Sequence, residues 1–292
     1  MCRFVFYHGP SLLLSSLLTE PAHSLIRQSF AATDREEPLN GDGFGVAWYA
    51  PEITREPAAF RMITPAWNDR NLMDLARVVK SRTVLAHVRA ATQVRAVNEA
   101  NCHPFRSGPF AFMHNGDVGG FTHFRRKLVE RLSDRAFEEI EGSTDSEHAF
   151  ALLLDELGHA DVPSPFALFD AVERTIDTLV ALSAEFGRGE ASYLNFAVTN
   201  GECAVVTRFT TLEDYDGESL YVHRGRRYVC DGGVCRMVAP DESGGAVIVS
   251  SERLSDDPGW EVVPRNHAVV VSDGGAAFRA LSVTSRSLRR AA

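Results

Sequence analysis

Short apolar runs and longer amphipathic stretches follow one another along this chain and predict an α+β protein. The apolar runs predict strands at 3–7, 43–50, 83–88, 110–114, 193–199, 203–209, 246–250 and 268–272. Apolar positions three and four residues apart predict helices at 11–18, 24–31, 72–79, 121–132, 146–157 and 165–186. Strands and helices come in blocks rather than in strict alternation, which favours antiparallel sheets over βαβ units.

The composition supports one packed domain. The chain has 292 residues, of which 45% are hydrophobic and 24% charged, so it has enough apolar material for a core. We find no internal repeat, low-complexity tract or linker in the sequence. We therefore expect a single domain over residues 2–272, followed by a basic C-terminal tail over 273–292 that is partly disordered.

Charge and hydropathy argue against several classes of protein. The net charge of −9 does not suit a nucleic-acid-binding protein, which needs a basic surface. No stretch reaches the ~20 apolar residues of a membrane helix. The apolar N-terminal stretch is interrupted by His8, Gly9 and Pro10, so we do not expect a signal peptide. These features predict a cytoplasmic protein with no nucleic-acid or membrane partner.

The cysteines do not predict a structural scaffold or a metal centre. There are five, an odd number scattered over the whole chain, which is not typical of a disulfide framework. Cys102-His103 and the pair Cys230 and Cys235 lack a second pair of ligands at zinc-site spacing. We therefore expect no metal site.

Cys2 is the first candidate for chemistry. The initiator methionine is removed when the next residue is small, so we expect Cys2 to become the mature N-terminus. Its α-amine, with a pKa of about 8, can then act as general base for its own thiol. The alternative is a partly buried second-position cysteine without a catalytic role.

Arg89 is a candidate for binding a carboxylate. It ends a predicted hydrophobic strand, where a guanidinium can face a cleft and hold a carboxylate through two parallel hydrogen bonds. Thr92 follows closely and offers a hydroxyl group to the same ligand. The alternative is an ordinary surface arginine at the end of a strand.

Two further motifs are each open to a functional and a structural interpretation. The Asn115 amide and the Gly116 N–H form a reasonable oxyanion hole for acyl transfer, but Asn-Gly is also a common hairpin turn. Asp145 follows Ser143 or Thr144 as helix cap, with Glu147 at a capping-box-like position. Asp145 either complements the helix dipole or binds a substrate ammonium group.

Five short motifs bring these candidates together in one order and spacing. They are Met-Cys-Arg at 1–3, His-Val-Arg-Ala-Ala-Thr at 87–92, Asn-Cys-His-Pro-Phe at 101–105, His-Asn-Gly at 114–116 and Thr-Asp-Ser-Glu at 144–147. In combination they resemble the class II glutamine amidotransferases, a family of N-terminal-nucleophile hydrolases. Ser-Ser-Glu-Arg-Leu at 250–254 is similar to a stand-alone branch that includes the ergothioneine-pathway γ-glutamyl hydrolase and the yeast-type glutathione-degradation amidotransferase subunit.

The resemblance implies a fold and a catalytic group. The fold is a four-layer αββα sandwich of two antiparallel sheets. Cys2 is the implied nucleophile, with its α-amine as base, and Asn115 and Gly116 form the oxyanion hole. The thiolate attacks a γ-carbonyl, and water hydrolyses the resulting γ-glutamyl thioester to glutamate. No metal or organic cofactor is required, because fixed hydrogen bonds polarise the carbonyl.

The resemblance also implies how the substrate is held. Arg89, assisted near Thr92, binds the α-carboxylate of a γ-glutamyl compound, and Asp145 binds its α-ammonium group. The sequence departs from better-known family members at Ala90, where they carry an aromatic residue.

Three functions are compatible with these motifs. The preferred one is hydrolysis of a γ-glutamyl amide, either glutamine or another γ-glutamyl small molecule. The second is a glutaminase subunit that delivers ammonia to a separate synthase. The resemblance to the glutathione-degradation amidotransferase subunit implies a peptidase as an alternative partner subunit. The third is a catalytically silent binding module, against which the intact Cys2, Arg89, Asn115 and Asp145 argue.

Overall fold

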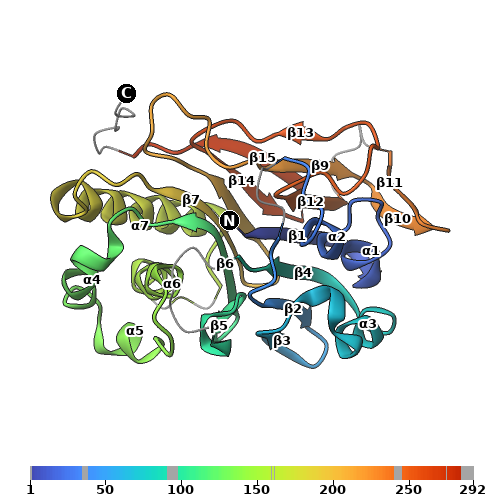
Figure 1. Cartoon of the computed structure of the whole chain (residues 1–292), viewed down its shortest axis with the longest axis horizontal. Helices are drawn as coiled ribbons and strands as arrows, with labels where there is room; N and C mark the ends of the chain where they lie inside the picture. The colour runs from blue at the N-terminus through green and yellow to red at the C-terminus, as the bar shows by residue number, and fades with distance from the viewer. Residues whose placement is uncertain are drawn as a thin grey trace.

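Two stacked antiparallel sheets form the centre of the protein (Figure 1). The computed structural model describes residues 2–34, 39–90, 98–158, 160, 162–239, 245–273 and 275–283. The larger sheet consists, in spatial order, of β13 (Glu261–Val262), β9 (Tyr221–Gly225), β12 (Ala246–Ser250), β1 (Arg3–Leu13), β4 (Lys80–Val88), β2 (Phe44–Ala50) and β3 (Thr54–Met62). The smaller sheet consists of β15 (Gly275–Ala280), β14 (His267–Ser272), β8 (Ala204–Arg208), β7 (Tyr193–Thr199), β6 (Phe110–Asp117) and β5 (Phe105–Ser107).

Helices cover the outer face of each sheet (Figure 1). The larger sheet is covered by α1 (Ser15–Leu18), α2 (Leu25–Gln28) and α3 (Arg70–Ala76), together with a hairpin of β10 (Arg227–Asp231) and β11 (Val234–Val238). The smaller sheet is covered by α4 (Phe121–Val129), α6 (Asp145–Glu156) and α7 (Pro165–Phe186), with α5 (Asp134–Glu138) packed beside α6. Two 3-10 turns, η1 (Ala66–Asn68) and η2 (Glu99–Asn101), lie in connections.

Three buried apolar layers separate these elements, and β1 contributes to two of them. Phe4 and Phe6 lie in the core between the two sheets. Val5 and Tyr7 lie in the core beneath the helices of the larger sheet, because successive side chains of a strand point to opposite faces. Phe112 belongs to the third core, under α4, α6 and α7. The αββα order of layers is therefore confirmed.

Some expected elements differ from the structure. The helix expected at 11–18 is a strand as far as Leu13 and only then a single helical turn, because β1 continues to pair with β4 after an irregularity in the register between His8 and Leu12. The helix expected at 24–31 is also a single turn. The sequence pattern does not predict strands β3, β5, β9, β10, β11, β13 and β15.

The expectation about disulfides is corrected by the β10–β11 hairpin. Cys230 and Cys235 are directly opposed in its register and form a disulfide. The sequence does not reveal this pair, because only the hairpin register places the two side chains opposite each other.

The domain continues past residue 272, where we expected it to end. Strand β15 pairs with β14, and Leu281 packs into the core under α7. Residues 284–292, the end of the expected tail, lie outside the described residues. No helix of the described chain combines the length and the hydropathy needed to cross a bilayer.

Candidate active site

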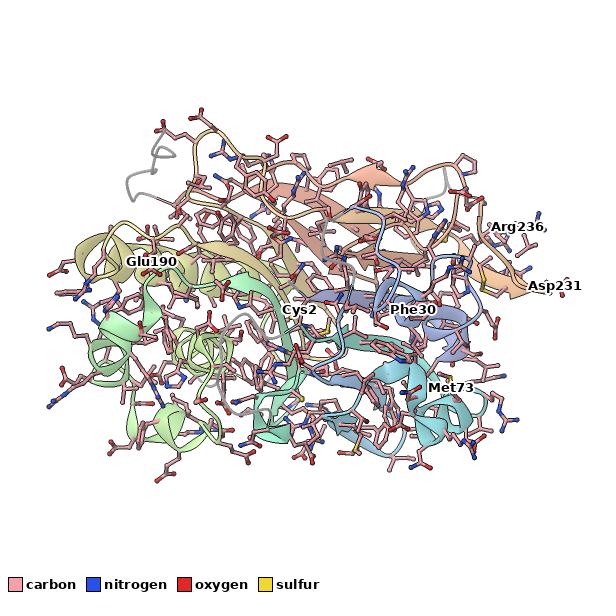
Figure 2. All side chains as sticks on the ribbon, in the orientation of Figure 1. Cys2, Phe30, Met73, Glu190, Asp231 and Arg236 are labelled. Atoms are coloured by element: carbon pink, nitrogen blue, oxygen red, sulfur yellow. A yellow bond between two sulfur atoms is a disulfide. The ribbon has the colours of Figure 1, made fainter. Side chains whose placement is uncertain are left out.

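Cys2 lies at the start of the central strand of the larger sheet. Because β1 and β4 are antiparallel and Arg3 faces Val88, Cys2 is placed beside the residues that follow β4. The Cys2 thiol donates a hydrogen bond to the carbonyl oxygen of Ala90 at 3.5 Å. Figure 2 shows Cys2 near the centre of the view, away from the periphery of the molecule.

Arg89 is held by backbone contacts with the loop before β2. Its N–H donates to the carbonyl oxygen of Gly43 at 2.8 Å, and its own carbonyl oxygen accepts from the N–H of Asp42 at 3.1 Å. The Arg89 side chain is only 7% exposed, and its Nη1 has no hydrogen-bond partner among the described residues. A buried guanidinium with a free donor is well suited to a ligand carboxylate.

Asn115 and Gly116 come from the other sheet, at the end of β6. The two sheets meet here, since His87 of β4 contacts the carbonyl oxygen of His114 through Nε2 at 3.2 Å. Gly116 has a φ of +143°, and a Cβ at this position would lie 1.8 Å from the Tyr193 carbonyl oxygen. A side chain is therefore excluded at Gly116, and this backbone position requires glycine.

Asp145 is the first residue of α6. Thr144, rather than Ser143, caps this helix by accepting from the Glu147 N–H. The Asp145 carboxylate accepts a hydrogen bond from the N–H of Val118 at 2.8 Å, which ties the helix to the loop after β6. The Glu147 carboxylate does not complete a capping box; it accepts from Gly142 and so shapes the preceding loop.

One cavity of about 250 Å³ brings most of the predicted site together. Cys2, Arg89, Gly116 and Asp145 all line it. Asn115 is buried one residue before Gly116, and its Oδ1 has no hydrogen-bond partner among the described residues. Thr92 lies outside the described residues, so its predicted contact with a substrate carboxylate stays a prediction.

The Cys2 thiol needs a base to become a nucleophile in this cavity. Burial raises its pKa, and the hydrogen bond to Ala90 and the positive charge of Arg89 offset this only in part. The thiol is therefore protonated at neutral pH, and the reactive thiolate has to be generated by proton transfer.

Three buried histidines near the cavity are in the neutral form. His103 and His114 line the cavity, and the His87 ring packs against that of His103 with centroids 4.3 Å apart. Burial lowers the pKa of all three, that of His87 to about 3. His114 is also fixed by contacts of its ring nitrogens with Ser146 and with the Tyr193 carbonyl oxygen, both at 2.9 Å.

Sequence reasoning missed other residues of the cavity. His103 belongs to the Asn-Cys-His-Pro-Phe motif but had no assigned role; it is buried, and neither of its ring nitrogens has a partner within the described chain. Glu190 and Tyr193 also line the cavity, and the Glu190 carboxylate accepts from the N–H of Gly120 at 3.0 Å. No local pattern indicates these two, because the pairing of β6 with β7 brings Tyr193 to the site together with the loop before β7 that carries Glu190.

Comparison with known proteins identifies the family. A family model described as class-II glutamine amidotransferases matches residues 13–291. The chain belongs to this family. The interpretation of the five motifs is thereby confirmed, and the fold agrees with it.

Two curated relatives of this class-II amidotransferase carry names that state different activities. The chain is 41% identical over 292 residues to the "probable glutamine amidotransferase DUG3" of Saccharomyces cerevisiae, covering 93% of this chain and 82% of the yeast protein. It is 28% identical over 277 residues to the γ-glutamyl-hercynylcysteine sulfoxide hydrolase of Mycolicibacterium smegmatis, covering 94% and 96% of the two chains.

Two solved structures share the fold of this chain. A glutamine aminotransferase class-II domain protein from Silicibacter pomeroyi superimposes with a TM-score of 0.66 at 27% identity, covering 96% of this chain and 99% of that chain. The allosteric regulatory enzyme of purine biosynthesis superimposes with a TM-score of 0.61 at 16% identity, covering 98% of this chain and 50% of that chain, which supports the fold alone.

Proposed function

We propose that this protein hydrolyses a γ-glutamyl amide bond through a thioester on Cys2 and releases glutamate. The observation that carries the proposal is the cavity in which the Cys2 thiol, the Gly116 backbone, Arg89 and Asp145 meet. A cationic and an anionic side chain match the α-carboxylate and α-ammonium groups of a γ-glutamyl compound. The thiol, once deprotonated, is the strongest nucleophile among these four residues.

In the proposed reaction, the α-amine of Cys2 takes the thiol proton and the sulfur attacks the γ-carbonyl carbon. The carbonyl oxygen becomes an oxyanion, which the Gly116 N–H and the Asn115 amide stabilise in a partly dehydrated site. The oxyanion collapses, the C–N bond breaks, and the leaving nitrogen takes the proton from the α-ammonium group. Water, deprotonated by the same amine, then attacks the thioester and releases glutamate with regeneration of the thiol.

A second candidate function concerns the fate of the leaving group. The yeast relative carries the name of a glutamine amidotransferase, whereas the mycobacterial relative is named a γ-glutamyl hydrolase. If glutamine is the substrate, ammonia is the leaving group and a separate synthase subunit is the proposed partner. If a larger γ-glutamyl compound is the substrate, the chain acts alone or together with a peptidase subunit as the proposed partner. We propose a cytoplasmic location in either case.

The isolated protein is expected to release glutamate from at least one γ-glutamyl compound. The test is an enzymatic glutamate assay with glutamine, γ-glutamylcysteine and γ-glutamyl anilide as substrates. The corresponding α-glutamyl isomers serve as controls and are expected to be inert, because their α-carboxylate is consumed in the amide. Equal hydrolysis of α- and γ-isomers, or no release from any γ-compound, contradicts the proposed function.

Replacing Arg89 or Asp145 is expected to lower kcat/KM by about 30-fold to several thousandfold. Loss of one charged partner of a desolvated group typically costs ~2–5 kcal/mol, and ~1.4 kcal/mol corresponds to a factor of ten. The variants are Arg89→Ala and Asp145→Asn, assayed with the best γ-glutamyl substrate. Arg174→Ala is the matched control, since Arg174 forms an ion pair with Glu156 at 2.8 Å on the helical surface. Normal kcat/KM in the first two variants would show that their roles are structural.

A further inference from the structure

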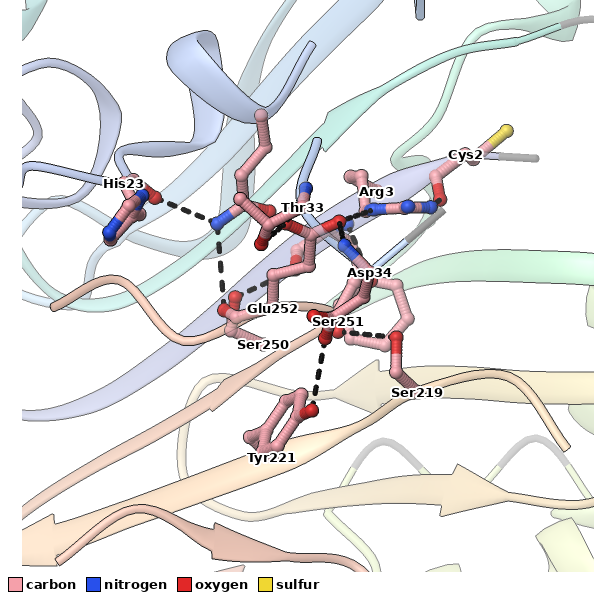
Figure 3. A network of polar contacts seen from close by, with 12 residues as sticks. Cys2, Arg3, His23, Thr33, Asp34, Ser219, Tyr221, Ser250, Ser251 and Glu252 are labelled. Atoms are coloured by element: carbon pink, nitrogen blue, oxygen red, sulfur yellow. Dashed lines mark hydrogen bonds and ion pairs between the residues drawn. The ribbon is translucent and has the colours of Figure 1, made fainter. Parts of the chain in front are cut away.

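A buried ion pair joins Arg3, the residue after Cys2, to Glu252 in the last sixth of the chain (Figure 3). The Arg3 Nε donates to a carboxylate oxygen of Glu252 at 2.7 Å, although the two residues are 249 positions apart in the sequence. The Arg3 Nη1 donates to the carbonyl oxygen of Cys2 at 3.0 Å. Arg3 is 1% exposed and Glu252 2% exposed, so solvent does not screen the pair.

The carboxylate of Glu252 is itself fixed from a third segment. Its second oxygen accepts from the N–H and the hydroxyl group of Thr33, at 2.9 and 3.0 Å. Burial alone would raise the pKa of Glu252, but the hydrogen bonds from Thr33 and the charge of Arg3 outweigh it and lower the pKa. Glu252 is therefore ionised at neutral pH, and its orientation is set by groups on both sides.

The backbone next to Arg3 is held by the residue next to Glu252. The Ser251 N–H donates to the Phe4 carbonyl oxygen at 3.0 Å, and the Phe4 N–H donates to the Ser251 hydroxyl oxygen at 3.1 Å. These contacts continue the pairing of β1 with β12, in which Val5 faces Ser250. Arg3 and Phe4 are thus anchored to one short segment, 250–252.

A nucleophile at the chain terminus has to be oriented by the residues that follow it. Once Cys2 is the first residue, no preceding chain restrains it, and the orientation of its thiol and α-amine depends on the residues after it. A hydrogen bond to the Cys2 carbonyl oxygen fixes the peptide plane between Cys2 and Arg3. This plane carries the Cα from which both the thiol and the α-amine project.

Stability alone is a weak reason for burying this pair. A buried ion pair often contributes no more than apolar residues of similar volume, because both charges lose their hydration. The Arg3 Nη2 is also buried without a hydrogen-bond partner among the described residues, so the guanidinium is not fully satisfied. The contact that distinguishes this pair is the one to Cys2.

We propose that Arg3 and Glu252 are positioning residues that hold the Cys2 carbonyl group and thereby aim the thiol and the α-amine at the substrate carbonyl. Neither residue touches the substrate; both act through Cys2. The inference rests on the proposed function to the extent that Cys2 is the nucleophile.

The test compares Glu252→Gln and Arg3→Lys with the wild type by steady-state kinetics and by alkylation of Cys2. We expect kcat to fall by about 10- to 100-fold, since a displacement of ~1 Å at a reacting group can cost a hundredfold in rate. KM is expected to stay within about threefold, because Arg89 and Asp145 still bind the substrate. The rate of Cys2 alkylation by iodoacetamide at neutral pH, followed by peptide mass spectrometry, is expected to fall as well.

Asp257→Asn is the matched control for loss of stability. Asp257 is 17% exposed and forms a pair with the buried His223 of β9 in the same sheet at 2.9 Å, without a contact to Cys2. This variant is expected to lower the melting temperature while kcat and the alkylation rate stay normal. If Glu252→Gln and Arg3→Lys behave in the same way as Asp257→Asn, the positioning role is overturned.

If Glu252→Gln does not fold, Thr33→Val removes one hydroxyl donor to Glu252 and is expected to lower kcat by a smaller factor; unchanged kcat would then contradict the proposal. If the wild type hydrolyses no γ-glutamyl compound, the proposed function fails. The alkylation rate of Cys2 in the two pair variants then decides the positioning role by itself.

Discussion

Cys2→Ala is expected to abolish hydrolysis of γ-glutamyl amides while the fold survives. Cys2 lines the cavity together with Arg89, Gly116 and Asp145, and removal of its thiol takes away the atom that forms the proposed thioester. The side chain is small and its hydrogen bond to Ala90 is long, at 3.5 Å, so the loss of packing is modest. Glutamate release and circular dichroism, measured on the same preparation, check both parts of the prediction.

Covalent labelling provides an independent measurement of the same role. Diazo-oxo-norleucine, a glutamine-like electrophile, is expected to add one label to the wild type, on residue 2. Cys203→Ala is the control and should keep both labelling and activity, because burial raises the pKa of the Cys203 thiol to about 11 and it does not line the cavity. A label on Cys102 or Cys203, together with an active Cys2→Ala variant, would refute the assignment.

A protein that retains any residue before Cys2 is expected to be inactive. A free α-amine has a pKa of about 8 and can accept the thiol proton near neutral pH. An amide nitrogen cannot, because its lone pair is delocalised into the carbonyl group. The nearby histidines are poor substitutes, since burial lowers the pKa of His87 to about 3 and also lowers the pKa values of His103 and His114.

The measurement uses a cleavable N-terminal tag, with mass spectrometry to establish the terminus before and after cleavage. Activity should appear only when Cys2 is exposed, while the circular dichroism spectrum stays the same. The same tag placed at the C-terminus is the control and should leave turnover normal. A folded, uncleaved protein with the wild-type rate would exclude the α-amine as base, and a side-chain base would have to take its place.

Local signals in the sequence were sufficient to predict the position of several helices and strands. The bounds of α7 follow from its apolar periodicity, from Pro165 in the first turn and from Phe186 as the last residue of the pattern. The strand Ala246–Ser250 agrees with its run of apolar residues. These signals work because helix periodicity and strand runs depend on residues that are close together in the chain. Where the pattern was ambiguous, as around Leu13, pairing with β4 prevailed over the helical spacing.

The sequence by itself determined the family, because the order and spacing of the motifs around Cys2, Arg89, Asn115 and Asp145 resemble the class II glutamine amidotransferases and the family model agrees. Only the tertiary structure decided which groups meet. Antiparallel pairing of β1 with β4 sets Cys2 beside Arg89, and pairing of β6 with β7 brings Tyr193 to the same cavity. The contact between Arg3 and Glu252 depends in the same way on strand register across 249 positions. A register is the outcome of packing two sheets against a shared core, and no short stretch of sequence contains that information.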